Sequence, residues 1–246
     1  MAKPPRPPAA VPAAIRLYAV GDIHGRSDLL ETLLQEIAED AVRHPETATK
    51  RLIYLGDYVD RGPASSTVID MVLHDAPPGF EVVPLMGNHE EMMLRFLEDH
   101  TVGRTWMMNG GDATLRSYGV DPPSMFAGTA LVRHAQQQFA ERLPARHKRF
   151  LEELAVSHTE GDYLFVHAGV RPGVPLEKQR SEDLLWIRDE FLESNRDFGK
   201  IVVHGHSIAL DPEFRPNRIG IDTGAYRSNQ LTCLVLEGTE RQLLTT

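Results

Sequence analysis

Short apolar runs and longer amphipathic runs alternate between Ile15 and about residue 90. The apolar runs are rich in β-branched residues and predict buried strands, whereas the amphipathic runs repeat their apolar positions every three or four residues and predict helices. In order, this part of the chain is βαβαβ, which requires a parallel sheet with right-handed crossovers. The predicted strands are residues 16–20, 51–55 and 81–85, and the predicted helices are residues 29–42 and 67–75.

The pattern changes after residue 90. Residues 91 to about 160 are predicted to be mostly helical, and five apolar runs then follow one another with short turns. Closely spaced strands of this kind predict a second, more antiparallel sheet. The runs are residues 163–166, 200–203, 218–221, 231–237 and 241–245. The predicted fold class is therefore α/β, with two mixed β-sheets packed as a central sandwich flanked by helices.

The first fourteen residues, MAKPPRPPAAVPAA, differ from the rest in composition. Proline lacks a backbone donor and disfavours helix, so residues 1–14 are predicted to be a flexible Pro/Ala-rich tail. A role for this tail in docking a partner is the alternative. With 246 residues and 41% hydrophobic content, the chain can bury one sizeable core, and residues 15–246 are predicted to form a single domain.

Acidic, amide and imidazole side chains lie beside glycine in five loops that follow predicted strands. Ligands of open α/β sheets bind where strands end, so these side chains are expected to converge on one rim. Carboxylate, imidazole and amide donors without thiolates suit manganese, iron or zinc, and the single Cys233 cannot supply a sulfur cage. The loops are Gly21-Asp22-Ile23-His24-Gly25, Gly56-Asp57-Tyr58-Val59-Asp60-Arg61-Gly62, Gly87-Asn88-His89-Glu90, His167-Ala168-Gly169 and His204-Gly205-His206.

These ligands are numerous enough for two metals that share one carboxylate. Two ions about 3.5–4 Å apart can clamp the attacking and leaving oxygens of an in-line displacement and activate water as a nucleophile near neutral pH. The pattern therefore indicates phosphoester hydrolysis.

The ordered series GDIHG, GDYVDRG, GNHE, a later HAG and a late GH resembles the calcineurin-like metallophosphoesterases. The resemblance is to their phosphoprotein phosphatase branch, with its bacterial and phage lambda-type members, and runs from about Val20 to Gly224. It implies two divalent ions, with manganese expected and iron or zinc as alternatives. It also implies that Asp57 bridges the ions, with one ion held by Asp22, His24 and Asp57 and the other by Asp57, Asn88, His167 and His206.

The same resemblance implies the remaining catalytic groups. His89 corresponds to the general acid, oriented by Asp60, and Arg61 and Asn88 are expected at the phosphate. The segment Leu184-Leu185-Trp186-Ile187-Arg188 is similar to a short motif of the lambda-type enzymes and implies Arg188 as a second phosphate-binding arginine. Two departures limit the comparison. The chain has His-Ala-Gly where His-Gly-Gly is usual, and it has IDTGA in place of the SAPNYC segment of eukaryotic members.

The activity implied by the resemblance is metal-dependent phosphomonoester hydrolysis, foremost of phosphoserine, phosphothreonine or phosphotyrosine in proteins. Hydrolysis of dinucleoside polyphosphates is the alternative, and stacking of a base on Trp106 or Tyr118 would favour it. Binding of phosphorylated partners without catalysis is a third, weaker reading, because every inferred ligand and the acid are present.

Several nearby residues have two interpretations. His204 could support a ligand or be an ordinary strand residue, and Asp222 could support a ligand or form a turn. Glu90 and Glu91 are expected to be structural, because carboxylates stabilise the first turn of a helix. The Trp106–Gly111 cluster is expected to be either a substrate-facing cap or a tight turn that ends a helix.

Net charge narrows the range of partners. A net charge of −9 opposes binding to nucleic acid or to an anionic membrane, although bound metals would make the cleft locally cationic. One cysteine fits a reducing compartment, and neither an apolar stretch of about 18 residues nor a signal-peptide core is evident. A cytoplasmic enzyme acting on a phosphorylated protein, a peptide or a nucleotide is expected, and its oligomeric state is left open.

Overall fold

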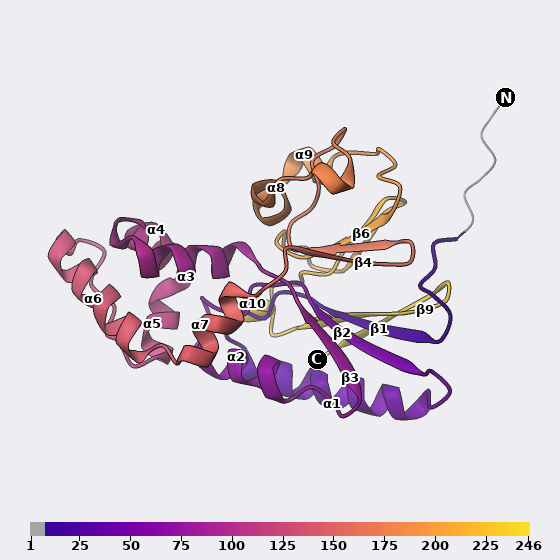
Figure 1. Cartoon of the computed structure of the whole chain (residues 1–246), viewed down its shortest axis with the longest axis horizontal. Coiled ribbons are helices and arrows are strands. Elements are labelled where there is room, and N and C mark those ends of the chain that lie inside the picture. Colours follow the sequence, from indigo (N-terminus) through magenta and orange to yellow (C-terminus); the bar gives the residue numbers. More distant parts are fainter. Residues whose placement is uncertain (1–7) are drawn as a thin grey trace.

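The apolar runs form two stacked five-stranded sheets in the computed structural model, which describes residues 8–246 (Figure 1). The first sheet has the strand order β10-β9-β1-β2-β3, and β1, β2 and β3 run parallel to one another. The predicted βαβαβ unit is thus confirmed. Its strands are β1 (Ile15–Val20), β2 (Thr49–Tyr54), β3 (Phe80–Pro84), β9 (Thr232–Glu237) and β10 (Glu240–Thr245).

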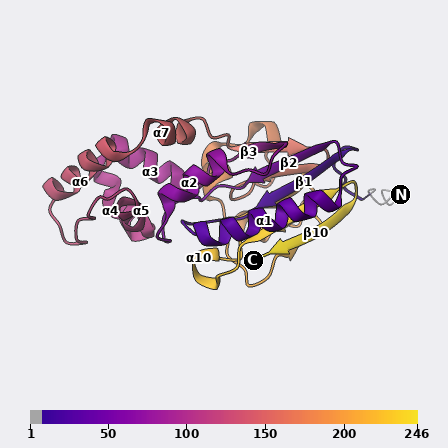
Figure 2. The same ribbon diagram turned by 90° about the horizontal axis from the view of Figure 1, so that it is seen from below.

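Two long helices cover the outer face of the first sheet. They are α1 (Ser27–Arg43) and α2 (Ser65–His74), and Figure 2 shows them lying across β1, β2 and β3. Leu30, Leu33 and Ile37 of α1 are fully buried and pack in one cluster with Tyr18 of β1. The spacing of these leucine and isoleucine residues is the pattern that predicted the helix.

The second sheet has the strand order β4-β5-β6-β8-β7. Its strands are β4 (Ser157–Glu160), β5 (Tyr163–Val166), β6 (Ile201–His204), β7 (Glu213–Phe214) and β8 (Arg218–Gly220). Strands β5, β6 and β8 are parallel and only the two edge pairs are antiparallel, so the expected antiparallel character holds at the edges alone. A second core lies between the sheets, where Leu17 and Ile53 of the first sheet pack with Phe165 and Val203 of the second.

The prediction for the last two strands was wrong about their sheet. Residues 231–237 and 241–245 were expected in the second sheet, but β9 pairs antiparallel with β1 and β10 pairs with β9. Strand β9 is buried on both faces, because Leu234 faces the core between the sheets and Val235 faces the cluster under α1. A strand buried on both faces fits either sheet, so its hydrophobic pattern does not select its neighbour.

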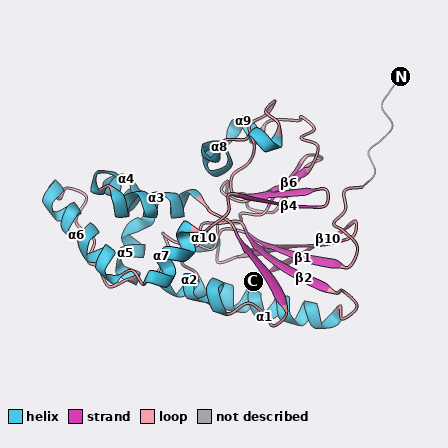
Figure 3. Cartoon of the chain, in the orientation of Figure 1, coloured by secondary structure: helices cyan, strands magenta, loops and turns pink. Residues whose placement is uncertain are grey.

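A helical lobe extends from one end of the sheets, where helices gather at the left of Figure 3. The mostly helical prediction for this region is confirmed. Its core contains the packed rings of Phe96, Trp106 and Phe139. The lobe comprises α3 (Asn88–Glu98), η1 (His100–Val102), α4 (Gly103–Trp106), η2 (Met107–Gly111), α5 (Asp112–Ser117), α6 (Thr129–Arg142) and α7 (Ala145–Glu152).

Short helices cover the rest of the second sheet and the rim. Leu184 and Phe191 pack with Leu164 and Val202 on the outer face of the second sheet. The elements are η3 (Leu176–Lys178), α8 (Ser181–Trp186), α9 (Asp189–Leu192) and α10 (Ala225–Ser228). None of the helices in residues 8–246 has the length and apolar character needed to cross a bilayer.

The predicted flexible tail was wrong for its last part. Ala9 and Val11 are buried and belong to the core between the sheets. The Val11 backbone N–H donates to the Gly238 carbonyl at 3.0 Å, and the Asp162 N–H donates to the Ala10 carbonyl at 2.9 Å. These small apolar side chains add to the core between the sheets, which the high proline content of the segment did not indicate. Residues 1–7 of the predicted tail lie outside the described residues.

Candidate metal centre and phosphate site

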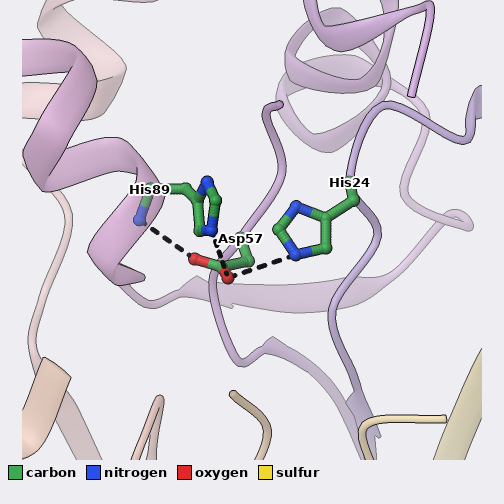
Figure 4. Close-up of side chains that lie close together, drawn as sticks. All are labelled: His24, Asp57 and His89. Carbon is green, nitrogen blue, oxygen red and sulfur yellow. Dashed lines mark hydrogen bonds and ion pairs between the residues drawn. The ribbon is translucent and has the colours of Figure 1, made fainter. Parts of the chain in front are cut away.

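The predicted loops meet at one rim because the parallel strands before them end on the same side of the two sheets. Asp57 lies at the centre, and Figure 4 shows His24 and His89 pointing toward its carboxylate. The Nε2 atoms of His24 and His89 lie 3.3 Å and 3.8 Å from Asp57 Oδ2. On the other side of the carboxylate, His167 Nε2 lies 3.4 Å from Oδ1. Asp57 therefore belongs to two clusters of ligand atoms.

The second cluster contains Asp57, His167 and His206, joined by Asn88. The amide Oδ1 of Asn88 lies 2.8 Å from His167 Nε2 and 2.9 Å from His206 Nδ1. The two imidazole nitrogens are 3.2 Å apart, and the buried Nε2 of His206 has no hydrogen-bond partner among residues 8–246. Four donors thus converge from four different loops.

The protonation pattern of the histidines shows that this donor set fits a cation. The Nδ1–H of His167 donates to the Leu55 carbonyl at 2.9 Å, so its Nε2 carries a lone pair when the ring is neutral. Burial lowers the pKa of His167 and favours that neutral form. Its lone pair nevertheless faces the Asn88 amide oxygen and the Asp57 carboxylate, which can only accept. A divalent ion is the group that would satisfy these converging acceptors.

His24 is oriented in a similar way, although its Nε2 faces the Arg61 guanidinium as well as the Asp57 carboxylate. Its Nδ1–H donates to the Val59 carbonyl at 2.8 Å, burial lowers its pKa well below the usual value, and its Nε2 points to Asp57. Asp22 lies beside the second cluster, where its carboxylate accepts the His206 backbone N–H at 3.1 Å, although neither cluster of ligand atoms includes it. Burial and the neighbouring Asp222 carboxylate raise the pKa of Asp22 well above its usual range. Removing two buried carboxylates from water is costly without a compensating cation.

Backbone strain is concentrated at this rim. Seven non-glycine residues of the described chain have positive φ, and five of them are predicted site residues. This left-handed conformation is costly for ordinary side chains and persists only where the surrounding structure holds it in place. The five residues are His24, Asp57, Asp60, Arg61 and His206.

Glu90 holds the Asp57 loop in that conformation. Its buried carboxylate accepts backbone N–H groups from Asp57, Tyr58, Val59 and Gly87 at 2.8–3.2 Å. Burial, followed by the Asp57 carboxylate, raises the pKa of Glu90 to about 8, while the backbone amides favour its charged form. Glu90 is structural, as expected, but it anchors the metal loop in addition to opening α3.

His89 is paired with Asp60 in the way the resemblance implied. Its Nδ1 lies 2.6 Å from Asp60 Oδ2, and the same carboxylate accepts Trp106 Nε1–H at 2.9 Å and the Thr114 hydroxyl at 2.6 Å. Burial lowers the pKa of His89, but the carboxylates of Asp57 and Asp60 outweigh it and the pKa is raised overall. Sequence reasoning missed Thr114, which no nearby motif marks.

Arg61 reaches both imidazoles at the front of the site. Its guanidinium lies 2.8 Å from His24 Nε2 and 3.0 Å from His89 Nε2, and it stacks 4.8 Å from the centre of the Tyr226 ring. Its backbone N–H donates to the Gly110 carbonyl at 3.1 Å. Sequence reasoning also missed Tyr226, which follows the IDTGA segment directly.

The Trp106–Gly111 cluster contains a backbone turn at Gly110, next to Arg61. Trp106 is fully buried and cannot stack on a base. Gly110, with a φ of 104°, interrupts the helix and places its carbonyl against Arg61, which agrees with the turn interpretation. Tyr118 packs inside the helical lobe, where its hydroxyl is hydrogen-bonded to His147 and its ring contacts Phe139.

Three residues complete the placement of the predicted set. Arg188 is exposed beside the second cluster and donates to the His206 carbonyl at 3.2 Å. His204 contacts Arg218 and the Phe191 ring, as an ordinary buried strand residue would. Asp222 accepts the Gly224 N–H at 2.9 Å in a turn and also contacts the Asp22 carboxylate, so it is both a turn residue and a neighbour of a predicted ligand. The structure thus brings all the predicted ligands to one rim, together with His89, Asp60 and both arginines.

A two-sheet sandwich whose rim combines imidazoles, carboxylates and arginines defines a metallophosphoesterase, a hydrolase of phosphoester bonds. The chain belongs to the calcineurin-like phosphoesterase family, whose sequence model matches residues 15–228. Members of this family bind divalent metals, which agrees with the donor chemistry described above.

Similar proteins carry two kinds of name. The chain is 32% identical over 155 residues to the symmetrical bis(5'-nucleosyl)-tetraphosphatase of Dechloromonas aromatica, covering 63% of this chain and 44% of that protein, so it spans less than half of that relative. It is 25% identical to the asymmetrical bis(5'-nucleosyl)-tetraphosphatase PrpE of Anoxybacillus flavithermus, covering 87% of this chain and 88% of that protein. It is 28% identical to serine/threonine-protein phosphatase 2 of Escherichia coli, covering 88% of this chain and 90% of that protein.

Solved structures support the fold alone. A crystal structure of a putative diadenosine tetraphosphatase superposes with a TM-score of 0.62 at 19% identity, covering 94% of this chain and 93% of that chain. A serine/threonine phosphatase from Saccharomyces cerevisiae superposes with a TM-score of 0.51 at 15% identity, covering 94% of this chain and 79% of that chain. The two-sheet architecture is thereby confirmed as that of the family.

Proposed function

We propose that this protein is a phosphomonoester hydrolase that uses two divalent ions, with manganese the expected metal and iron or zinc the alternatives. The carrying observation is that the Asp57 carboxylate belongs to both clusters of ligand atoms. When bound, two such metal ions would polarise phosphoryl oxygens and activate water near neutral pH. The proposed ligands are Asp22, His24 and Asp57 for one ion and Asp57, Asn88, His167 and His206 for the other.

The chain's own polar groups would perform the remaining work. Arg61 lies beside His24 and Arg188 beside His206, and both can bind phosphate oxygens through forked hydrogen bonds, together with Asn88. His89 is fixed by Asp60 through Nδ1, which leaves Nε2 to give a proton to the leaving oxygen. In this proposal Asp60 positions the acid and stays charged.

The primary proposed substrate is a phosphoserine, phosphothreonine or phosphotyrosine side chain of a protein, supported by the similarity to the Escherichia coli serine/threonine-protein phosphatase over nearly the whole chain. The second candidate is a dinucleoside polyphosphate, supported by the tetraphosphatase relatives and by an exposed aromatic residue, Trp186, beside the centre. We further propose that residues 15–246 act as one domain and that the enzyme works in the cytoplasm.

One assay separates the two substrates. Purified enzyme loaded with manganese is given phosphoserine, phosphothreonine and phosphotyrosine peptides and diadenosine tetraphosphate, and kcat/KM is measured for each. A phosphoprotein phosphatase gives its highest kcat/KM on a peptide. If only the dinucleotide is turned over, the second candidate replaces the first.

A further inference from the structure

Trp186 lies at the surface of the fold, between α8 and α3. Its side chain is 37% exposed, and it joins none of the three buried clusters. Its indole is nevertheless held in one orientation, because Nε1–H donates to Glu91 Oε2 at 2.6 Å across the gap between α8 and α3. A rigid, exposed aromatic ring that does not stabilise a core is a feature typical of a binding surface.

The ring forms one wall of a small cavity between α8 and the helical lobe, which we call the Trp186 pocket. Its volume is about 160 Å³. This is roughly the space of five water molecules at about 30 Å³ each, enough for one planar ring system. The lining residues are Met92, Arg95, Val102, Thr105, Trp106 and Trp186.

The pocket is next to the metal centre. The Trp186 ring is edge-on to the His206 ring, with centroids 6.4 Å apart. Trp186 also lines a second cavity of about 450 Å³ beside Arg188, whose other walls include four acidic residues. The same indole therefore lies between His206, a predicted metal ligand, and the smaller pocket.

We propose that the Trp186 pocket binds the base of a nucleotide whose phosphate is held at the metal centre. This inference rests on the proposed phosphoesterase function, and it favours the second candidate substrate, a nucleotide, over the phosphorylated protein. The lining offers the contacts that bases use. The indole supplies a face for stacking, the exposed guanidinium of Arg95 can stack or donate, and the exposed Thr105 hydroxyl can bond a base edge.

The position of the pocket favours a base over the ring of phosphotyrosine. In phosphotyrosine a single oxygen joins the ring to phosphorus, which keeps the ring against the metal ligands. In a nucleotide the sugar and the phosphate chain separate the two ends. The Trp186 ring lies between His206 and the pocket. A ring bound in the pocket is therefore separated from the metal ligands, as the base of a nucleotide is separated from its phosphate.

Competitive inhibition tests the subsite directly. AMP and ribose 5-phosphate share a phosphate and a sugar and differ by the base, so their inhibition constants against p-nitrophenyl phosphate isolate what the base contributes. We expect AMP to bind more tightly by about 5-fold or more in the unaltered enzyme, the lower end of what stacking of one base supplies. In Trp186→Leu and in Arg95→Met this ratio should fall toward one.

A matched control is available on the same lobe. Arg133 is an exposed arginine of α6 that does not line the pocket, so Arg133→Met should keep the ratio of the unaltered enzyme. Arg95 is itself 64% exposed, so Arg95→Met is expected to fold even if Trp186→Leu does not.

A ratio near one in the unaltered enzyme overturns the base subsite, while p-nitrophenyl phosphate turnover still reports on the phosphoesterase function. A loss of phosphotyrosine-peptide affinity in Trp186→Leu, with the AMP ratio unchanged, assigns the pocket to a tyrosyl ring and also overturns the proposal.

Discussion

The indole N–H of Trp106 lies 2.9 Å from Oδ2 of Asp60, in the interior of the protein where neither side chain is exposed. The Asp60 carboxylate accepts three side-chain donors, which are Trp106 Nε1–H, the Thr114 hydroxyl and Nδ1–H of His89. The helical lobe is therefore connected to the candidate acid through one buried carboxylate. This connection can be tested by replacing the indole with a smaller ring that lacks the N–H donor.

Trp106→Phe should destabilise the protein by about 1.5–3 kcal/mol, because a buried hydrogen bond to a charged group is lost. Urea unfolding followed by circular dichroism measures the change. Trp186→Phe is the matched control, since it also removes an indole–carboxylate bond, but at the exposed rim. An equal loss of unfolding free energy in both variants would show that burial of the Trp106–Asp60 hydrogen bond does not increase its contribution to stability.

Gly110→Ala should weaken phosphate binding through Arg61. A Cβ at Gly110 would lie 2.6 Å from the Arg61 backbone nitrogen, so the loop that carries the guanidinium must move. We expect KM for p-nitrophenyl phosphate to rise several-fold. Gly79→Ala is the control, because Gly79 also has positive φ, at +83°, but no atom lies within 4 Å of its added Cβ. If both variants keep the KM of the unaltered enzyme, Gly110 does not position Arg61.

The motif loops could be predicted from the sequence because each follows a buried apolar strand and contains its own ligands. Asp57 and His167 lie at the predicted rim for that reason. The supporting contacts could not be predicted, since they depend on how the lobe packs. Trp106 is 46 residues from Asp60, and nothing in the intervening sequence indicates that the two meet. The sequence also could not predict which sheet β9 joins, because a strand buried on both faces fits beside several neighbours.

Arg16→Met should be severely destabilising although Arg16 is far from the site. The Arg16 guanidinium is 2% exposed and donates to Asp40 at 2.9 Å and to the Tyr18 hydroxyl at 3.1 Å. Removing it leaves the Asp40 carboxylate buried without its main partner, which costs about 3–5 kcal/mol. Chemical denaturation gives the value. Arg43 lies 3.8 Å from the same carboxylate but is 61% exposed, so Arg43→Met should cost less than about 1 kcal/mol.

Metal removal should abolish activity, and manganese should restore it. Asp57→Asn should then reduce the content of both ions, because one carboxylate serves both clusters, whereas Arg188→Ala should leave metal content near that of the unaltered enzyme. Elemental analysis of the purified variants makes the comparison. Retention of both ions at normal affinity in Asp57→Asn would rule out the bridging role, and full turnover after chelation would rule out a metal mechanism.

The role of His89 gives the sharpest test of the mechanism, because its Nε2 lies close enough to Asp57 to be either a proton donor or a metal ligand. A proton donor matters most where the leaving oxygen is a strong base, as in phosphoserine, and least for a nitrophenolate. His89→Asn should therefore keep its metals, lose roughly 10²-fold or more in kcat on phosphoserine peptides, and lose distinctly less on p-nitrophenyl phosphate. Lower metal content would make His89 a ligand. Equal losses on both substrates with full metal content would mean that it organises the site or binds phosphate.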